Sequence, residues 1–321
     1  MSILVIVEHD RGVVAPATFE ALTAARSLGE PIHAITIGSA ADGLVDQLAA
    51  HGAVVVVRAH HDLLTDYGPE AWGETVAQYV GHSSPSAVIA TGTDRGNEVM
   101  AHVGAILDLP FVANCLSFDV AGASDPWQIT RVRWGGSLLE QCELSAATKL
   151  VTIVHHAVEA SESPITASTE SFAPRLEAWH GRSVVVDRVE RAAGVTLSTA
   201  AVVVGGGRGV GSPEAFAPLE DLASLLGGVV GCSRAVTNNG WRNHTDQVGQ
   251  TGTRIAPDIY LACGISGAIQ HWVGAMASKK ILAINTDPEA NMVAKADYAV
   301  IGDLHQVVPA IAAEIRRRRN A

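Results

Sequence analysis

The 321-residue chain has few aromatic residues, few charged residues and no long apolar run. Aromatic side chains make up 5% of it and charged side chains 17%, whereas 48% of the residues are hydrophobic. No segment reaches the ~20 consecutive apolar residues that a membrane helix needs, so we expect no transmembrane span. The opening MSILVIVEHD has no basic segment before its apolar run, so we also expect no signal peptide.

Cysteine is scarce, and its spacing excludes the common cysteine-based sites. Cys115, Cys142, Cys232 and Cys263 lie far apart, and no Cys-x-x-Cys or Cys/His pattern indicates zinc. We therefore predict no metal site and a reduced, cytoplasmic protein. No Ser-His-Asp set or paired carboxylates stand out either, so any redox chemistry belongs to a bound cofactor.

Negative charge is concentrated in the first part of the chain. Residues 194–321 hold 11 Lys+Arg and 10 Asp+Glu, a net charge of +1, and residues 1–193 hold the remaining 11 and 23, a net charge of −12. An acidic first part argues against nucleic acid as a partner. The nearly neutral second part is the better host for an anionic cofactor.

Strand and helix patterns alternate through the first half. Short apolar runs rich in β-branched residues predict buried strands at 2–9, 31–38, 53–59, 86–92 and 111–120. Apolar residues at helical spacing predict helices between them, at 16–29, 41–52, 70–82 and 96–110. This order predicts a largely parallel sheet with helices on both faces.

Residues 159–181, EASESPITASTESFAPRLEAWHG, are rich in Ser, Glu, Thr and Pro and show no periodicity. We interpret them as an extended connection between two domains, 1–193 and 194–321. Another apolar run, SVVVDRVE at 183–190, predicts a strand near this boundary.

The second half restarts the alternation and predicts a Rossmann-like domain. Strands are expected in TAAVVVGGG, VVGCS, IYLAC, KKILAIN and YAVIG, and a final helix in the segment that ends RRRR. Such a domain binds its ligand at the carboxyl ends of the strands. The unusual polar and glycine-rich clusters of this half all follow predicted strands.

The first of these clusters, GGGRGVGSP, fits no nucleotide-binding motif. Its glycines do not match G-x-G-x-x-G, and Ser212-Pro213 stands where a P-loop needs Lys-Ser/Thr. Arg208 in this loop is a candidate pyrophosphate contact, and a mobile loop with a solvated arginine is an equal alternative. The next cluster places Ser233 and Arg234 just past a strand, where Arg234 matters only if it shares a crevice with Arg208.

The cluster ACGISGAIQH, residues 262–271, predicts a helix that begins close to a ligand. Ser266 is the expected N-cap, and Gly267 keeps side chains away from the first free amides. Those amides and the helix dipole favour negative charge. A lone histidine on a helix is more often a bystander, but the position of His271 beside this N-terminus favours a functional role.

Three further positions follow strands or turns. Gln250 and Thr251, in DQVGQTGTR, are suited to hydrogen-bonding a flat heterocycle, although a structural turn uses the same residue types. Asp303 is suited either to a ribose contact or to capping the last helix.

Taken in order, the segments GGGRGVGSPEAF, GCSRAV, QVGQTG, PDIYLACGISGAIQH, AINTDPEA and ADYAVIGDLHQVVP resemble the α subunit of electron transfer flavoprotein. The resemblance is close across residues 200–310 and looser before them. It implies a heterodimer in which this subunit holds FAD and a β subunit covers the cofactor and usually carries AMP. It also implies an electron carrier without its own substrate. Electrons would come from flavin dehydrogenases, such as the acyl-CoA dehydrogenases of fatty acid oxidation, and leave through a flavin semiquinone to a membrane quinone oxidoreductase.

Residue by residue, the resemblance implies a set of FAD contacts at Arg208, Ser233, Arg234, Val248, Gly249, Gln250, Thr251, Ser266, Gly267, Ala268, Ile269, Gln270, His271, Asn285, Asp303 and Leu304. Arg234 matches the arginine over the flavin ring, Thr251 the hydroxyl near its central nitrogen, and His271 the imidazole near its pyrimidine carbonyl. We expect Arg234 and His271 to add positive potential there and to tune the redox potential.

The chain departs from the family pattern at several places. Thr253 stands where the family often has lysine, NTDPEAN replaces NKDPEAP, and RVRWGGSLLEQCELS at 131–145 is unusual. A nicotinamide- or adenine-nucleotide-binding protein without a carrier role is the alternative, although the missing G-x-G-x-x-G argues against a nicotinamide site.

Overall fold

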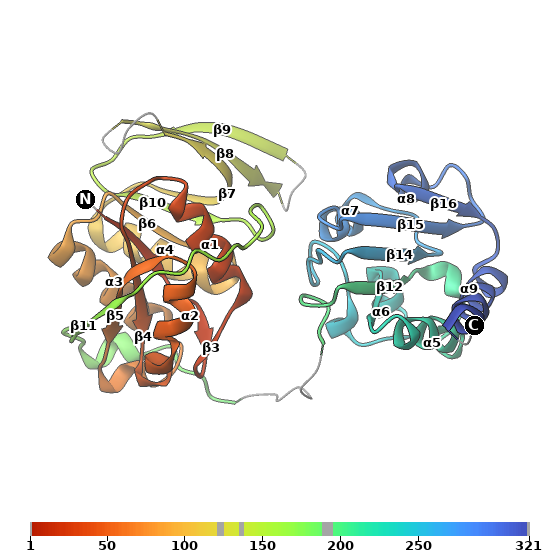
Figure 1. Ribbon diagram of the computed structural model, residues 1–321, viewed down its shortest axis with the longest axis horizontal. Helices are drawn as coiled ribbons and strands as arrows, with labels where there is room; N and C mark the ends of the chain where they lie inside the picture. Colours follow the sequence, from red (N-terminus) through yellow and green to blue (C-terminus); the bar gives the residue numbers. More distant parts are fainter. Residues whose placement is uncertain (1, 121–124, 135–137, 188–194, 320–321) are drawn as a thin grey trace. The chain divides into compact units, whose positions relative to one another are not determined.

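The computed structural model describes residues 2–120, 125–134, 138–187 and 195–319. The chain divides into two compact units, the first formed by residues 1–133 and 138–190 and the second built mainly from residues 191–321. Each unit contains its own sheet with helices packed on it (Figure 1). The predicted class, two α/β domains with largely parallel sheets, is confirmed. In the described part of the chain, no helix is both long and apolar enough to cross a membrane.

The first unit is built on a nine-stranded sheet of order β11-β5-β4-β1-β6-β10-β7-β8-β9. Neighbouring strands pair in parallel from β11 to β7, and β7, β8 and β9 pair antiparallel. The strands are β1 (Ile3–Ile6), β4 (Ile32–Ile37), β5 (Ala53–Ala59), β6 (Ala87–Thr91), β7 (Phe111–Asp119), β8 (Trp127–Arg133), β9 (Leu138–Leu144), β10 (Lys149–Ile153) and β11 (Ser168–Phe172). A small hairpin, β2 (His9–Asp10) with β3 (Val13–Val14), follows β1.

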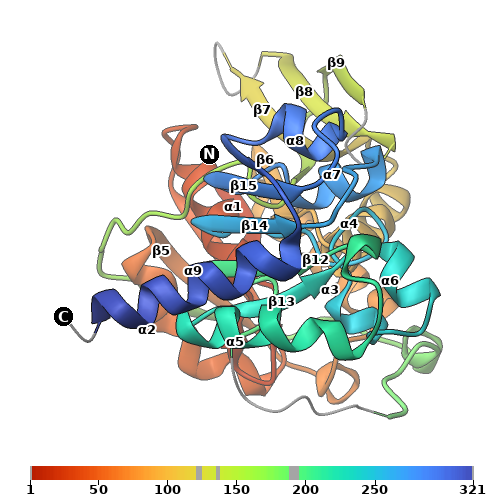
Figure 2. The same ribbon diagram turned by 90° about the vertical axis from the view of Figure 1, so that its right-hand side faces the viewer.

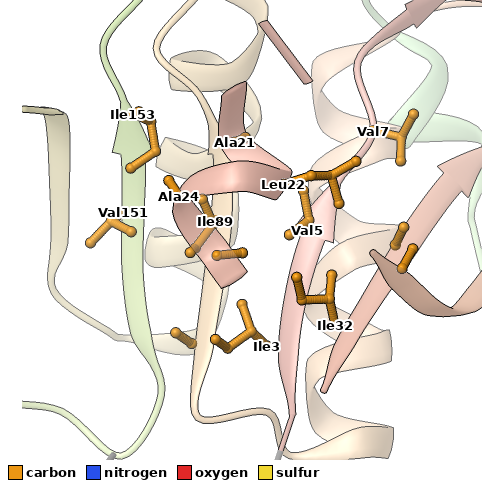
Figure 3. Close-up of a cluster of buried hydrophobic side chains, with 14 of the residues drawn as sticks. Ile3, Val5, Val7, Ala21, Leu22, Ala24, Ile32, Ile89, Val151 and Ile153 are labelled. Carbon is orange, nitrogen blue, oxygen red and sulfur yellow. The ribbon is translucent and has the colours of Figure 1, made fainter. Parts of the chain in front are cut away.

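The two faces of this sheet are covered by different helices. Alternate residues of a strand point to opposite faces, so Ile3 and Val5 pack against α1 and α2, whereas Leu4 packs against α3 and α4. Figure 3 shows the first of these cores, in which Ala21 and Leu22 of α1 lie among the strand residues. The helices are α1 (Pro16–Arg26), α2 (Val45–Ala50), α3 (Pro69–Ser83) and α4 (Asp94–Leu107), with 3-10 turns at η1 (Ser39–Leu44), η2 (Asp62–Leu64) and η4 (Ala178–Gly181).

The segment 159–181 is not the bare connection that its composition predicts. Its residues 168–172 form β11, which pairs in parallel with β5 at the edge of the sheet. An edge strand pairs with one neighbour only and stays partly exposed to solvent, so it tolerates polar residues. Those polar residues hid this strand in the sequence. The predicted strand at 183–190 is wrong for residues 183–187, which form no strand, and residues 188–190 lie outside the described residues.

The second unit is built on a five-stranded, entirely parallel sheet of order β13-β12-β14-β15-β16. The strands are β12 (Val202–Gly206), β13 (Val229–Cys232), β14 (Ile259–Cys263), β15 (Lys280–Asn285) and β16 (Tyr298–Ile301). Its helices are α5 (Ala217–Leu225), α6 (Arg234–Asn238), α7 (Ile269–Ala275), α8 (Asn291–Lys295) and α9 (Leu304–Arg319), with 3-10 turns at η5 (Arg208–Val210), η6 (Glu214–Phe216) and η7 (His244–Asp246).

Helices cover both faces of the second sheet and leave its carboxyl edge to loops. One core joins the sheet to α5 and α9, which lie in front of the strands in Figure 2, and another joins it to α7 and α8. The chain goes from β12 to β13 on one side and then returns to β14 on the other. Such a reversal of strand order opens a crevice at the carboxyl ends of the strands, where ligands bind in open α/β sheets.

Candidate functional site

A pocket of about 470 Å³ lies at the carboxyl edge of the second sheet. The loops that follow β12, β13, β14 and β15 line it, as the strand order predicts. Its lining residues are Arg208, Gly209, Ser233, Arg234, Ala235, Gly264, Ile265, Ser266, Gly267, Ala268, Gln270, His271, Asn285, Asp287 and Ala290.

The floor of the pocket is made by two loops whose backbones touch. Gly207 donates its N–H to the carbonyl of Cys263 at 2.8 Å, and Gly209 donates to the carbonyl of Gly264 at 3.1 Å. A Cβ atom at Gly207 would lie 2.1 Å from the Gly264 oxygen, so only glycine fits there. The glycines after β12 therefore allow the close approach of two loops.

Two arginines enter this pocket from neighbouring loops. Arg208 begins the turn η5 after β12, and Arg234 begins α6 after β13. Within the described residues, neither guanidinium makes an ion pair or hydrogen bond, whereas Arg242 binds both Glu220 and Asp246. The sequence left open whether Arg208 and Arg234 share a crevice, and they do. Two guanidinium groups without a counter-ion in one pocket favour an anionic ligand.

The loop between β14 and α7 is longer than predicted, because the helix begins after the predicted position. Helix α7 begins at Ile269, its N-cap residue is Ala268, and no side chain caps it, so the prediction of Ser266 as N-cap is wrong. Hydrogen bonds from Asn285 and Met292 hold this loop in place instead. Asn285 donates its side-chain N–H to the carbonyl of Ile265 at 3.1 Å, and Met292 donates its backbone N–H to the carbonyl of Ser266 at 3.2 Å. These contacts leave the side chains of Ser266 and Gln270 exposed at the pocket.

His271 lies in the first turn of α7, as predicted, but its ring faces the protein interior. Its Nε2 lies 2.8 Å from Oη of Tyr260, and only 6% of the residue is exposed. Its Nδ1 is buried, and no hydrogen bond of ordinary geometry joins it to a described residue, although the backbone of Val248 is close enough to act on the ring. Burial lowers the pKa of His271 to about 4, and the backbone of Val248 opposes this shift only in part. Burial therefore favours the neutral ring at pH 7, whereas the sequence predicts that His271 adds positive potential to the site.

The polar loop at 247–253 borders α7 without lining the pocket. The amide side chain of Gln247 is buried between Thr237, which donates to it at 2.8 Å, and Thr251, which accepts from it at 2.9 Å. The backbone of Gln250 donates to the carbonyl of Gln270 at 2.7 Å and so ties this loop to the pocket wall. The hydroxyl of Thr251, a predicted cofactor contact, is thus used within the loop.

The structure brings together one part of the predicted site. Arg208, Ser233, Arg234, Ser266, Gly267, Ala268, Gln270, His271 and Asn285 line the pocket. Val248, Gly249, Gln250, Thr251, Ile269, Asp303 and Leu304 do not. The carboxylate of Asp303 accepts a hydrogen bond from the backbone of His305 at 2.9 Å and caps α9, which agrees with its structural alternative.

Several lining residues were missed by sequence reasoning. Gly209, Ala235, Ile265 and Ala290 are small or apolar and carry no chemical signal. Asp287 could have been predicted from the sequence, because it follows a strand in the same way as Asp303. Its N–H binds the side chain of Asn285 at 3.1 Å, and its carboxylate accepts from the backbone of Glu289 at 2.9 Å. The carboxylate therefore orders the turn that closes this side of the pocket.

Comparison with known proteins covers both units. A family model described as the electron transfer flavoprotein domain matches residues 3–180, and one described as the electron transfer flavoprotein FAD-binding domain matches residues 196–276. The chain is 34% identical over 319 residues to the electron transfer flavoprotein subunit alpha of Bacillus subtilis, covering 98% of this chain and 97% of that protein. It is 35% identical to the subunits of the same name from Mycobacterium tuberculosis H37Rv (99% of each chain) and Paracoccus denitrificans (98% of this chain, 100% of that protein).

Proposed function

Because the chain belongs to the electron transfer flavoprotein α-subunit family and carries that family's FAD-binding domain, we propose that it is the cofactor-carrying half of a heterodimeric electron carrier. Its partner is a β subunit that covers the pocket and carries AMP. The electron donors are flavin dehydrogenases, such as the acyl-CoA dehydrogenases of fatty acid oxidation, and the acceptor is a membrane quinone oxidoreductase. The chain has no substrate of its own.

The observation that carries this proposal is the pair of guanidinium groups in one pocket. FAD is anionic, and Arg208 and Arg234 bring two positive charges into the pocket that form no ion pair with a described residue. The volume of about 470 Å³ lies within the range of small-molecule sites. Bound FAD supplies the electron uptake and release, and the chain supplies binding, orientation and electrostatics. The pocket residues therefore fit the cofactor that the family binds.

We further propose that different loops of the pocket contact different parts of the cofactor. Arg208, Ser266 and Asn285 are placed for its polar, phosphate-bearing part, and Arg234 for the flavin ring. The predicted contacts at Val248–Thr251 stand on a loop that is tied to Gln270 by one backbone hydrogen bond, so they border the same pocket wall. In this arrangement Arg234 is the source of positive potential, because His271 is neutral.

His271 contributes through hydrogen bonding in this proposal. If Tyr260 donates its proton to Nε2, the ring carries its own proton on Nδ1 and acts there as a donor. Tyr260 is suited to this role because burial raises its pKa well above the usual value, so its hydroxyl keeps its proton. The pair then fixes one tautomer of the histidine in the wall of the pocket.

The proposal is tested on the chain purified together with its β subunit. We expect the complex to show the visible absorption of oxidised FAD, to lose it on stepwise anaerobic reduction, and to reduce a quinone oxidoreductase. A complex that neither retains FAD nor takes it up on reconstitution would contradict the carrier function. Binding of a nicotinamide or adenine nucleotide by that flavin-free complex would support the nucleotide-binding alternative.

A further inference from the structure

We propose that Glu20, His155 and His156 of the first unit form a binding site for one divalent transition-metal ion, with Zn²⁺ as the ion to test first. Each residue offers one ligand atom, and the three atoms all lie within 4.8 Å of one another. In the part of the chain that the structure describes, no other group of three His, Cys, Asp or Glu residues meets this condition. Two imidazoles and one carboxylate are a common zinc ligand set.

The cluster is formed where α1 passes the carboxyl end of β10. Glu20 lies in the middle of α1 on its buried side, and His155 and His156 follow β10 after one intervening residue. His156 is separated from Glu20 by 136 positions in the chain. Only the packing of α1 on the sheet brings these residues together.

Glu20 uses its two oxygens differently. One oxygen accepts a hydrogen bond from the backbone N–H of His156 at 2.8 Å, which fixes the direction of the carboxylate. The other oxygen lies 3.4 Å from Nδ1 of His156, longer than a tight charge-assisted hydrogen bond. Two ligand atoms that each lie ~2.1 Å from one tetrahedral ion are about 3.4 Å apart. The spacing of this pair is therefore that of two ligands of one ion.

The backbone at His156 brings the two imidazoles to the same place. Consecutive side chains of an extended segment point to opposite sides, but His156 has a φ of +63°, a left-handed conformation that few residues other than glycine adopt. The ring centroids of His155 and His156 consequently lie 5.1 Å apart, with an angle of 44° between the ring planes. The turn at His156 therefore places both rings beside Glu20.

The chemistry of the ligands selects the class of ion. Nitrogen ligands favour Zn²⁺, Co²⁺, Ni²⁺ and Cu²⁺, whereas Mg²⁺ and Ca²⁺ prefer oxygen ligands alone. The side chains of Glu20 and His156 are 12% and 20% exposed, so the ion would be mostly enclosed and still reachable from solvent. Three protein ligands leave one tetrahedral position for water or for a group from a partner.

The test compares Zn²⁺ binding by ligand variants of the full-length chain purified with its partner. Glu20→Gln keeps an acceptor for the His156 backbone N–H but lacks the charge. His156→Asn removes the ring, and asparagine tolerates the left-handed backbone. The matched control is His82→Asn, which removes a histidine that is 64% exposed and lies 3.8 Å from Glu170. Far-UV circular dichroism checks that each variant is folded.

After chelator treatment, the proteins are equilibrated with Zn²⁺ by dialysis and their metal content is measured. We expect one tightly bound Zn²⁺ per complex in the wild type and in the His82→Asn control, and at least tenfold weaker binding in Glu20→Gln and His156→Asn. X-ray absorption at the zinc edge should show imidazole ligands in the tight site. Equal binding in the wild type and the ligand variants, or no tight binding in the wild type, would overturn the proposal and leave the cluster as a His–Glu ion pair.

Discussion

Oη of Tyr260 lies 2.8 Å from Nε2 of His271; both side chains are buried, and His271 lines the pocket. Tyr260 comes from β14 and His271 from α7, so their hydrogen bond ties a strand of the sheet to the helix that borders the site. A Cβ at Gly205 would lie 2.3 Å from this hydroxyl, so the glycine in β12 leaves room for it. The hydrogen bond therefore joins the sheet to α7 beside the pocket.

Tyr260→Phe tests the function of this hydrogen bond. The variant leaves a buried ring nitrogen unpaired, so we expect a loss of about 1–2 kcal/mol in the free energy of unfolding. We also expect a changed midpoint potential of bound FAD, because the tautomer of His271 is no longer fixed. Tyr298→Phe is the control, since Tyr298 is 62% exposed. A loss of stability with an unchanged potential would show that the hydrogen bond is only structural.

The buried His271 predicts a specific loss of stability in acid. The pKa of this group is lowered to about 4 in the folded chain, against 6.5 as the ordinary value. Between these values the unfolded chain binds more protons than the folded chain, so acidification favours unfolding. Between pH 7 and pH 4.5, His271 should therefore lower the free energy of unfolding by about 2–3 kcal/mol.

The measurement is urea unfolding of the wild type and of His271→Asn at both pH values. The wild type should lose more stability between pH 7 and pH 4.5 than the variant does. His9 and His33, whose pKa values burial also lowers, remain in both proteins and cancel from the comparison. An equal loss in both proteins would mean that His271 does not resist protonation.

Arg208→Gln and Arg234→Gln test the electrostatics of the pocket. Hydrogen bonds to charged groups contribute about 1.5–3 kcal/mol, so each variant should bind FAD roughly 10- to 100-fold more weakly. Arg317→Gln, which changes an exposed arginine paired with Glu314 on α9, serves as the control. FAD affinity is measured by fluorescence during reconstitution of the flavin-free complex. Unchanged FAD affinity in both pocket variants would show that neither arginine contributes to FAD binding.

Arg234→Gln should also change the midpoint potential of the retained FAD. A positive charge near the ring favours the reduced, more negative cofactor, so its removal lowers the potential. Arg208→Gln should change the potential less, because we place Arg208 at the phosphates. A spectroelectrochemical titration of the three complexes compares these values, and a raised potential in Arg234→Gln would contradict the proposed placement.

Gly267→Ala tests whether the pocket loop depends on close packing. Gly267 has a φ of +77°, and an added Cβ would lie 2.3 Å from the backbone nitrogen of Met292. Gly240 has a similar φ of +70° with nothing within 4 Å of such a Cβ, so Gly240→Ala isolates the conformational cost. We expect Gly240→Ala to lose about 1–2 kcal/mol and Gly267→Ala to lose more, together with its FAD. Urea unfolding and flavin content decide between these outcomes.

Sequence patterns determined the class of this protein because they reflect local physical constraints. The continuous apolar run that includes Ile3, Leu4 and Val5 predicted a buried strand, and the structure divides these residues between two cores. Polar and glycine-rich residues after each strand of the second half predicted a ligand site at the carboxyl edge. The order of those clusters also carried the family resemblance.

Tertiary structure alone decided which groups meet and in what state. The edge strand β11 was hidden because its pairing with β5 depends on a distant segment. The neutrality of His271 follows from its burial beside Tyr260, which no local pattern records. Glu20 meets His155 and His156 only because α1 packs over the end of β10. Local sequence specifies elements and their chemistry, whereas burial and long-range proximity arise only when the elements pack.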